Sequence, residues 1–332
     1  MKKEWLARGI VALGLTIAVV IPAVGWWQQK QTTVVHAHMA ETGGWMPENL
    51  TAQVGKPIHL RLTSDDVTHG FAVGQLDQPG VDVLPGDMTD VTLVFEKPGK
   101  YTFYCTRWCS VNHWRMRGTI EVTDPNLKVE PAKPPLYVTL GLDIDAEHVS
   151  SVTPAQMPAA WRGALLKRAV PEQYTNRDYY LSHTPVDLWL SLRSEPSFKD
   201  LTDQEVWDLV AWVWQSNTTP DEIQTGRALF AANCAACHGE NGAGNGVFAD
   251  QLAATTGNAN SGSSMGDHTQ RPADFTDPGH MLATSPIHLQ GKIIRGGMGT
   301  GMPYWGPIFT QDQTWALVAY LYSFQFELEV LK

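Results

Sequence analysis

Alternating apolar and polar positions recur in short segments of the first part of the chain. Residues 58–62 and 91–95 alternate with a period of two, and turns rich in glycine and proline separate them from further runs at 101–104 and 118–122. Many short strands divided by such turns are typical of a β-sandwich or barrel. We therefore expect an all-β domain over residues 31–124.

The segment before this domain is apolar without alternation. Residues 9–27 contain almost only apolar side chains, and about 19 residues is the length that a bilayer-spanning helix needs. Basic residues precede the segment, which predicts a cytoplasmic N-terminus and export of everything that follows. We expect residues 1–30 to be a single-pass anchor in the plasma membrane, with the rest on the extracytoplasmic side. The alternative is a signal peptide cleaved at residues 35–37, which would export the same domains.

After residue 149 the apolar spacing changes to that of a helix. Residues 125–149 begin with a proline-rich polar stretch and are expected to be a linker. Apolar residues then recur at helical spacing in 205–212, 221–232 and 313–320, and threonines suited to capping precede the first two of these segments. The pattern predicts a multidomain chain in which all-α domains follow the all-β domain.

Composition adds little about the fold but narrows the range of partners. The chain has 332 residues, a formal net charge of −10 and a pI of about 5.5. An acidic protein of this kind is not expected to bind nucleic acid, and its charge suits a basic partner. The four cysteines form two close pairs in different parts of the chain. Such pairs occur in disulfides and in metal sites, so the neighbouring residues must distinguish between them.

The first pair lies in a loop between two predicted strands. This loop contains four potential metal ligands, Cys105, Cys109, His113 and Met116, and His69 lies upstream at a strand end. Thiolate, thioether and imidazole groups favour copper, and the loop contains no carboxylate. The second cysteine is placed so that two thiolates can bridge two metal ions. A disulfide would leave the histidines and the methionine unexplained, and a zinc site would not require methionine.

From His69 to Met116 the chain resembles the CuA domain of haem-copper oxidase subunit II, and the single predicted anchor matches the branch with one membrane helix. The resemblance implies a cupredoxin Greek-key fold that holds a CuA centre of two copper ions. It also implies the ligands: bridging Cys105 and Cys109, one histidine for each copper (His69 and His113), and weak contacts from Met116 and the backbone carbonyl of Arg107. Many family members have glutamate at position 107, where it helps to hold magnesium. Since this chain has arginine there, we expect no magnesium.

The second cysteine pair belongs to the sequence Cys234-Ala235-Ala236-Cys237-His238, which follows the helix predicted at 221–232. This spacing is the haem c attachment signature: two thiols bond to the haem, and the adjacent histidine ligates the iron. Residues 218–332 resemble class I cytochromes c, and this resemblance implies that Met302, which precedes a proline, is the sixth iron ligand. Met298 is the alternative. Methionine–histidine ligation suits electron transfer.

The segment before the cytochrome-like domain repeats part of it. Residues 184–188 resemble 285–289, and residues 205–212 match 313–320. In this register Glu195 occupies the position of Met302, and the repeat has no Cys-x-x-Cys-His sequence. We therefore expect residues 150–217 to be a cytochrome c-like domain without haem that serves as a spacer. An unrelated helical insertion is the alternative.

Together the resemblances imply the electron-transfer subunit, subunit II, of a haem-copper terminal oxidase, with no catalytic residues of its own. A soluble donor, a cytochrome c or a cupredoxin, would reduce haem c, and the electron would pass through CuA to a membrane-embedded catalytic subunit I that reduces O2. The alternatives are the CuA-type subunit of a nitric oxide reductase and a free-standing membrane-anchored electron carrier. A copper-delivery protein is disfavoured because the ligand set would close the site. Nitrous oxide reductase would need a histidine-rich propeller for which the chain has no room.

Overall fold

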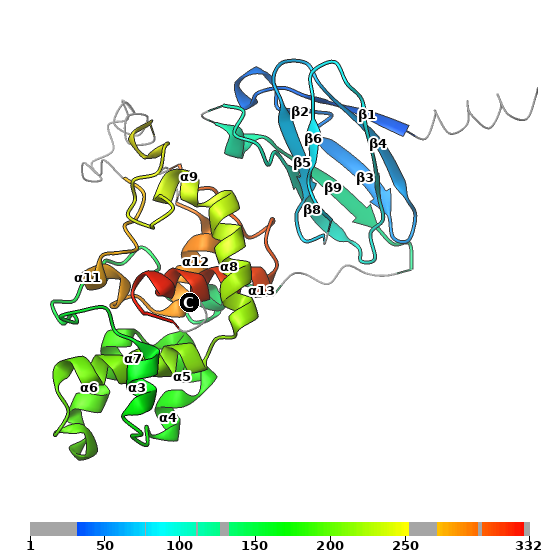
Figure 1. Ribbon diagram of the computed structural model, residues 1–332. Coiled ribbons are helices and arrows are strands. Elements are labelled where there is room, and N and C mark those ends of the chain that lie inside the picture. The colour runs from blue at the N-terminus through cyan, green and yellow to red at the C-terminus, as the bar shows by residue number, and fades with distance from the viewer. Residues whose placement is uncertain are drawn as a thin grey trace, which may run out of the picture. The chain divides into compact units, whose positions relative to one another are not determined.

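The computed structural model describes residues 32–76, 78–110, 112–126, 133–251, 271–297 and 301–328 (Figure 1). The chain divides into two compact units, Met1–Pro131 and Ala132–Lys332. The anchor predicted at residues 1–30 lies outside the described residues. Within the described ranges, no helix is both long and apolar enough to cross a bilayer.

The first unit is a β-sandwich, as the alternating pattern predicted. One sheet has the strand order β2-β1-β4-β7, and the other has the order β3-β9-β8-β5-β6. Most neighbouring strands are antiparallel, but β1 pairs with β4 and β3 pairs with β9 in parallel. The elements in chain order are β1 (Thr32–Ala37), the 3-10 helix η1 (Ala40–Thr42), β2 (Trp45–Met46), β3 (Asn49–Gln53), β4 (Ile58–Ser64), β5 (His69–Val73), β6 (Val81–Val83), β7 (Thr89–Leu93), β8 (Gly99–Tyr104), the 3-10 helix η2 (His113–Arg115) and β9 (Arg117–Thr123).

The inner faces of both sheets supply the core of this unit. Val35 and Leu62 from one sheet join Phe71, Phe103 and Ile120 from the other in a single buried cluster. Since alternate residues of a strand point to opposite faces, each strand can bury one face and leave the other to solvent. Strand β1 lies inside its sheet, between β2 and β4. Cleavage at residues 35–37, the alternative to an intact anchor, would therefore remove a core strand.

The loop that holds the first cysteine pair begins where β8 ends and closes where β9 starts. Ala72 of β5 pairs with Tyr104 of β8, which brings the start of β5 beside this loop. Gly70 permits the close approach, because a Cβ atom at this position would lie 2.0 Å from the side-chain oxygen of Thr106. The sandwich thereby places His69 at the loop that contains Cys105.

The second unit is all-α, as the helical spacing predicted. The helix expected at 221–232 runs from Pro220 to Asn233, and Thr219 caps its start. The elements are α2 (Leu136–Thr139), α3 (Ala160–Leu165), α4 (Glu172–Thr175), α5 (Arg177–Ser182), α6 (Pro185–Ser194), η3 (Pro196–Phe198), α7 (Asp203–Ser216), α8 (Pro220–Asn233), α9 (Ala235–His238), α11 (Pro278–Met281), α12 (Pro286–Arg295), α13 (Gln311–Leu321) and η4 (Tyr322–Phe324).

Two helix pairs of this unit cross at equivalent points. In α8, Gly226 packs so closely on α13 that a Cβ atom would lie 2.0 Å from the carbonyl oxygen of Ala316. In α3, Gly163 packs in the same way on α7, where a Cβ atom would lie 2.1 Å from the carbonyl oxygen of Asp208. In the repeat recognised from the sequence, Asp208 corresponds to Ala316. In both crossings a glycine therefore meets the corresponding position of the repeated helix, Asp208 in α7 and Ala316 in α13.

The C-terminal residues join these two helix pairs. The backbone N–H of Glu327 donates to the carbonyl of Pro158, and the Glu327 carbonyl accepts from the N–H of Ala160. The buried ring of Trp214 packs against Tyr322 at 5.9 Å and against Phe326 at 6.3 Å between centroids. Hydrogen bonds and aromatic packing thus bind the helices of residues 160–216 to the end of the chain.

Part of the expected linker folds onto the second unit. Residues 136–139 form helix α2 beside α12, and Ile144 is buried. Asp145 forms ion pairs with Lys292 at 2.6 Å and with Arg295 at 2.5 Å. Within the segment predicted as a linker, apolar and charged side chains of residues 136–145 therefore contact α12.

Candidate copper and haem centres

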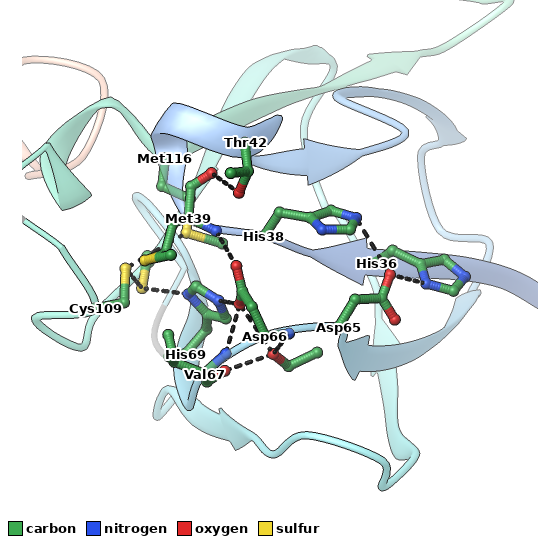
Figure 2. A network of polar contacts seen from close by, with 12 residues as sticks. His36, His38, Met39, Thr42, Asp65, Asp66, Val67, His69, Cys109 and Met116 are labelled. Carbon is green, nitrogen blue, oxygen red and sulfur yellow. Dashed lines mark hydrogen bonds and ion pairs between the residues drawn. The ribbon is translucent and has the colours of Figure 1, made fainter.

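The predicted copper ligands converge at one end of the sandwich. His69, Cys105 and Cys109 form a group whose potential ligand atoms all lie within 4.8 Å of one another. The Sγ atoms of Cys105 and Cys109 are 3.8 Å apart, and Cys109 Sγ is 3.8 Å from the sulfur of Met116. Figure 2 shows Cys109, Met116 and His69 close together on the left of the view. Both cysteines are free, so the structure contains no Cys105–Cys109 disulfide.

His69 is fully buried and held in one orientation. Its Nε2 lies 2.7 Å from Oδ1 of Asp66, and its Nδ1 lies 3.8 Å from Cys105 Sγ. Burial alone would lower the pKa of His69, but hydrogen bonds with Cys105 and Asp66 outweigh it and raise this pKa. Burial would likewise raise the pKa of Asp66, but hydrogen bonds from His69 and from backbone N–H groups lower it to about 2. An ionised Asp66 can only accept a hydrogen bond from Nε2–H, so the ring is oriented with Nδ1 toward Cys105, where a bound metal ion would take the place of a proton.

The pKa values of the two thiols, Cys105 and Cys109, are shifted in opposite directions. The hydrogen bond from Cys109 lowers the pKa of Cys105 far below the ordinary value of a thiol, against the opposing effect of burial. That same hydrogen bond, together with burial, raises the pKa of Cys109. One thiol of the pair is thus shifted toward the thiolate and the other toward the neutral form, and a bound cation would favour the loss of both protons.

The remaining predicted ligands line the same site. The carbonyl oxygen of Arg107 lies 3.2 Å from Cys105 Sγ, whereas the Arg107 side chain turns away and pairs with Asp82. His113 also lowers the pKa of Cys105, yet its buried Nδ1 has no hydrogen-bond partner among the described residues. The half-exposed ring of Trp108 packs on His113, with 4.2 Å between centroids. An unpaired buried nitrogen close to thiolates is what a site prepared for a cation would contain.

These donors fit paired copper ions. Thiolate–metal bonds are about 2.3 Å long, so two sulfurs 3.8 Å apart can both contact ions placed between them. Two sulfur types, imidazole nitrogens and a carbonyl oxygen match the preference of copper, and the thioether argues against zinc. His69, Cys105, Cys109 and Met116 therefore lie together beside the backbone carbonyl of Arg107, whereas His113 is not part of the group within 4.8 Å and is linked to it through Cys105.

The second centre lies at the end of α8, in the other unit. Cys234 ends this helix, and Cys237 and His238 lie in the short helix α9. His238 Nδ1 donates to the carbonyl oxygen of Ala273 at 3.0 Å, which leaves Nε2 available to an iron ion. The ring of Phe275 stacks on His238 at 4.7 Å between centroids. Burial lowers the pKa of His238, which favours the neutral imidazole that a metal requires.

The two cysteine pairs are prepared for different chemistry. Burial raises the pKa of Cys234 to about 12 and of Cys237 to about 11, so both remain neutral thiols. The pKa values of this pair are thus shifted in the direction opposite to that of Cys105. Met302 is half-buried in the loop after α12, where its carbonyl accepts from Gly297. The alternative ligand, Met298, lies outside the described residues.

Sequence reasoning missed the residues that support the ligands. Asp66 orients His69, the indole N–H of the buried Trp45 donates to the Met116 carbonyl at 3.2 Å, and the Ala273 carbonyl orients His238. Asp66 could have been suspected, because it lies three residues before a predicted ligand. A backbone carbonyl and a tryptophan contact over 71 positions leave no local sequence signal.

Two family models match the chain in these regions. Residues 45–123 match the periplasmic domain of cytochrome c oxidase subunit II, and residues 223–325 match cytochrome c. The first match spans the predicted copper ligands, and the second spans the haem attachment sequence and Met302.

Curated relatives are similar over the first of these regions. Cytochrome c oxidase subunit 2 of Thermus thermophilus is 37% identical over 81 residues, which are 24% of this chain and 59% of the relative. The same-named protein of a second strain of that organism is equally similar, with 48% of its length covered. Nitrous-oxide reductase of Ralstonia nicotianae is 36% identical over 72 residues, which are 20% of this chain and 11% of that enzyme. The chain thus spans about half the length of the oxidase subunits it matches.

Solved structures with partial similarity include a haem-copper terminal oxidase dimer, with 21% identity, coverage of 37% of this chain and 99% of that chain, and a TM-score of 0.24. The periplasmic domain of cytochrome oxidase subunit II of Bradyrhizobium japonicum has 19% identity, coverage of 29% and 85%, and the same TM-score.

Proposed function

We propose that this chain is the electron-transfer subunit, subunit II, of a haem-copper terminal oxidase. The proposal rests on one observation: a single chain combines a thiolate–imidazole–thioether cluster in a subunit II domain with a haem attachment sequence in a cytochrome c domain. Both donor sets suit one-electron carriers.

In the first domain, six residues would hold a CuA centre: Cys105, Cys109, His69, His113, Met116 and Arg107 through its carbonyl. Copper bound there would supply reversible one-electron transfer. Asp66 fixes the ring of His69, and Trp45 fixes the backbone of Met116, so the ligands stay in place when the charge of the centre changes. The buried rings of Phe71 and Phe103, which pack on Trp45, keep water from this end of the core.

In the second domain, Cys234 and Cys237 would bind haem c covalently, and His238 and Met302 would ligate its iron. Haem bound there would supply a second one-electron carrier. The hydrogen bond to the Ala273 carbonyl orients His238, and the Phe275 ring supports it from one side. Methionine as the second ligand would favour a potential suited to electron transfer and would leave no open position for O2.

The proposed setting follows from the family of the first domain. A periplasmic domain of subunit II implies an extracytoplasmic location, anchored to the plasma membrane by residues 1–30. The membrane-embedded partner, catalytic subunit I, would contain the O2-reducing site. The net charge of −10 would favour a basic soluble donor, such as a cytochrome c or a cupredoxin.

For residues 150–217 we propose a cytochrome c-like domain that has lost haem. Its support is the matching pair of glycine crossings, at Gly163 and at Gly226. Glu195, at the position of Met302, lies 3.4 Å from the hydroxyl of Tyr174. A carboxylate engaged by a phenol is not a ligand for haem iron in this class of site. The domain would act as a packed spacer beside the haem domain.

The test is purification of the native complex from membranes through a tag on this chain, followed by turnover with O2 and with NO under a reducing donor. The proposal predicts a co-purifying haem-copper subunit and O2 consumption. NO reduction without O2 consumption would contradict the oxidase assignment and place the chain with the nitric oxide reductases. A chain that purifies alone and supports no turnover would be an anchored electron carrier instead.

A further inference from the structure

Two histidines and one aspartate outside the proposed centres share a polar contact on the surface of the first unit. His36 and His38 are separated by one residue at the end of β1, and Val35 and Ala37, on either side of His36, are buried in the core. Since alternate residues of an extended segment point to the same side, both rings face solvent. His36 is 43% exposed and His38 is 24% exposed.

Asp65 joins the two rings. Its Oδ2 atom lies 2.8 Å from His36 Nδ1 and 3.2 Å from His38 Nε2, and Figure 2 shows this carboxylate between the rings. The backbone holds the arrangement, because the N–H of Asp65 donates to the Ala37 carbonyl and Ala37 pairs with Ser64 in the parallel ladder. The three side chains are therefore placed together by the sheet.

We propose that His36, His38 and Asp65 form a second metal site, which binds a divalent transition-metal ion and prefers Cu(II). Imidazole and carboxylate are the donors that Cu(II) favours in tetragonal sites, and copper binds such donors more tightly than the other divalent ions of the first row. Asp65 already interacts with both imidazole nitrogens, so an ion can take the place of these contacts. In the structure the ligand atoms of the three residues do not all lie within 4.8 Å of one another, so coordination requires the rings to turn toward one ion.

Bound metal would fix the turn that supports the proposed CuA centre without contributing a ligand to it. The next residue, Asp66, accepts from the Met39 N–H at 2.7 Å and holds His69. His38 precedes Met39, and Asp65 precedes Asp66. A metal ion bound to His38 and Asp65 would therefore restrain the hydrogen bond between Met39 and Asp66. The proposal does not depend on the proposed function, since it concerns binding of an ion by three surface residues.

The test is titration of the full-length chain, loaded with haem and copper and purified without a polyhistidine tag, with Cu(II) alone. Electron paramagnetic resonance should detect an added mononuclear tetragonal Cu(II) ion with nitrogen coupling. His36→Gln and His38→Gln should each weaken its binding at least about tenfold, as should Asp65→Asn. His59→Gln is the matched control, because His59 is an exposed histidine on the adjacent strand β4 that bonds only Thr92 in the structure.

Unchanged Cu(II) affinity in the His36→Gln/His38→Gln double variant would overturn the proposal. So would an added Cu(II) signal without nitrogen coupling, or the absence of any added signal in the unaltered chain. Far-ultraviolet circular dichroism of each variant would establish that it is folded. Asp65→Asn then provides a second route to the same conclusion, because it leaves both histidines in place.

Discussion

The Nε2 atom of His69 donates a hydrogen bond to Oδ1 of Asp66 across 2.7 Å, inside the end of the β-sandwich that carries the predicted copper ligands. Asp66 is itself held by the backbone N–H groups of Met39, at 2.7 Å, and Val67, at 2.6 Å. A carboxylate that is fixed in this way can fix an imidazole in turn. The arrangement selects which nitrogen of His69 faces the cysteines, before any metal arrives.

Asp66→Asn should weaken copper retention by about 10–100-fold, the usual cost of losing a partner that orients a metal ligand. The amide keeps an oxygen near His69 but loses the negative charge that stabilises the Nε2 proton. Copper remaining after dialysis against graded chelator measures the effect. Asp90→Asn is the control, because Asp90 is 78% exposed and pairs with Arg61 on the sheet surface. Equal copper retention in the two variants would show that Asp66 does not support the ligand.

Replacing both Cys234 and Cys237 by serine should abolish covalent haem attachment. Serine hydroxyls cannot form the thioether bonds, so any haem held by His238 alone would leave on denaturation. Haem-dependent peroxidase staining of a denaturing gel checks this. Cys105→Ser should retain full staining, since it removes a cysteine of the other unit. Staining lost equally in both variants would contradict the separation of the two cysteine pairs into two centres.

Gly163→Ala and Gly226→Ala should destabilise the helical unit by similar amounts, about 1–3 kcal/mol each. Each added methyl group would meet a backbone carbonyl of the facing helix, at 2.1 Å for Gly163 and 2.0 Å for Gly226. Urea unfolding followed by circular dichroism measures the loss. Gly279→Ala is the control in the same unit, because its methyl group would come no nearer than 3.2 Å to a neighbouring atom. A large effect at only one of the two helical glycines would argue against the duplicated domain.

Asp145→Asn should lower the stability of the helical unit at neutral pH by about 1 kcal/mol, the upper range for a partly exposed ion pair. Hydrogen bonds from Arg295 and Lys292 lower the pKa of Asp145 below its ordinary value of 3.8. A carboxyl whose pKa is lower in the folded state than in the unfolded state stabilises the fold at pH values above its unfolded-state pKa. This contribution is lost as the pH falls through the folded-state pKa. The difference between variant and parent should therefore shrink only below pH 3.8. A difference that disappears at higher pH would contradict the ion-pair assignment.

Local sequence patterns predicted the elements that build the two units. The alternating segments are strands of a two-sheet core, and Thr202 and Thr219 cap the starts of α7 and α8. The copper loop could be recognised because Cys105, Cys109, His113 and Met116 lie within 12 residues of one another in one connection. The residue types define the donor atoms, and the short spacing indicates that these donors can meet at one site.

Contacts between distant parts of the chain could not be predicted. The segment around Asp145 had no periodicity, and its partners on α12 lie 147 and 150 positions away. The position of Asp66 beside His69 depends on how the turn after β4 folds. The hydrogen bond from Trp45 depends on how two sheets pack. Such contacts arise from the tertiary fold and have no period or motif in the sequence.

The most direct test of the central claim is single-turnover kinetics of the purified complex that contains Cys105→Ser, compared with the unaltered complex. We predict that a soluble donor reduces haem c at an unchanged rate in the variant, because His238, Cys234 and Cys237 lie in the other unit. We also predict that O2 consumption is abolished, because Cys105 is the most acidic thiol of the copper cluster and contacts both His69 and Cys109. Unimpaired O2 consumption in the variant would contradict the proposal that electrons reach the catalytic subunit through this site.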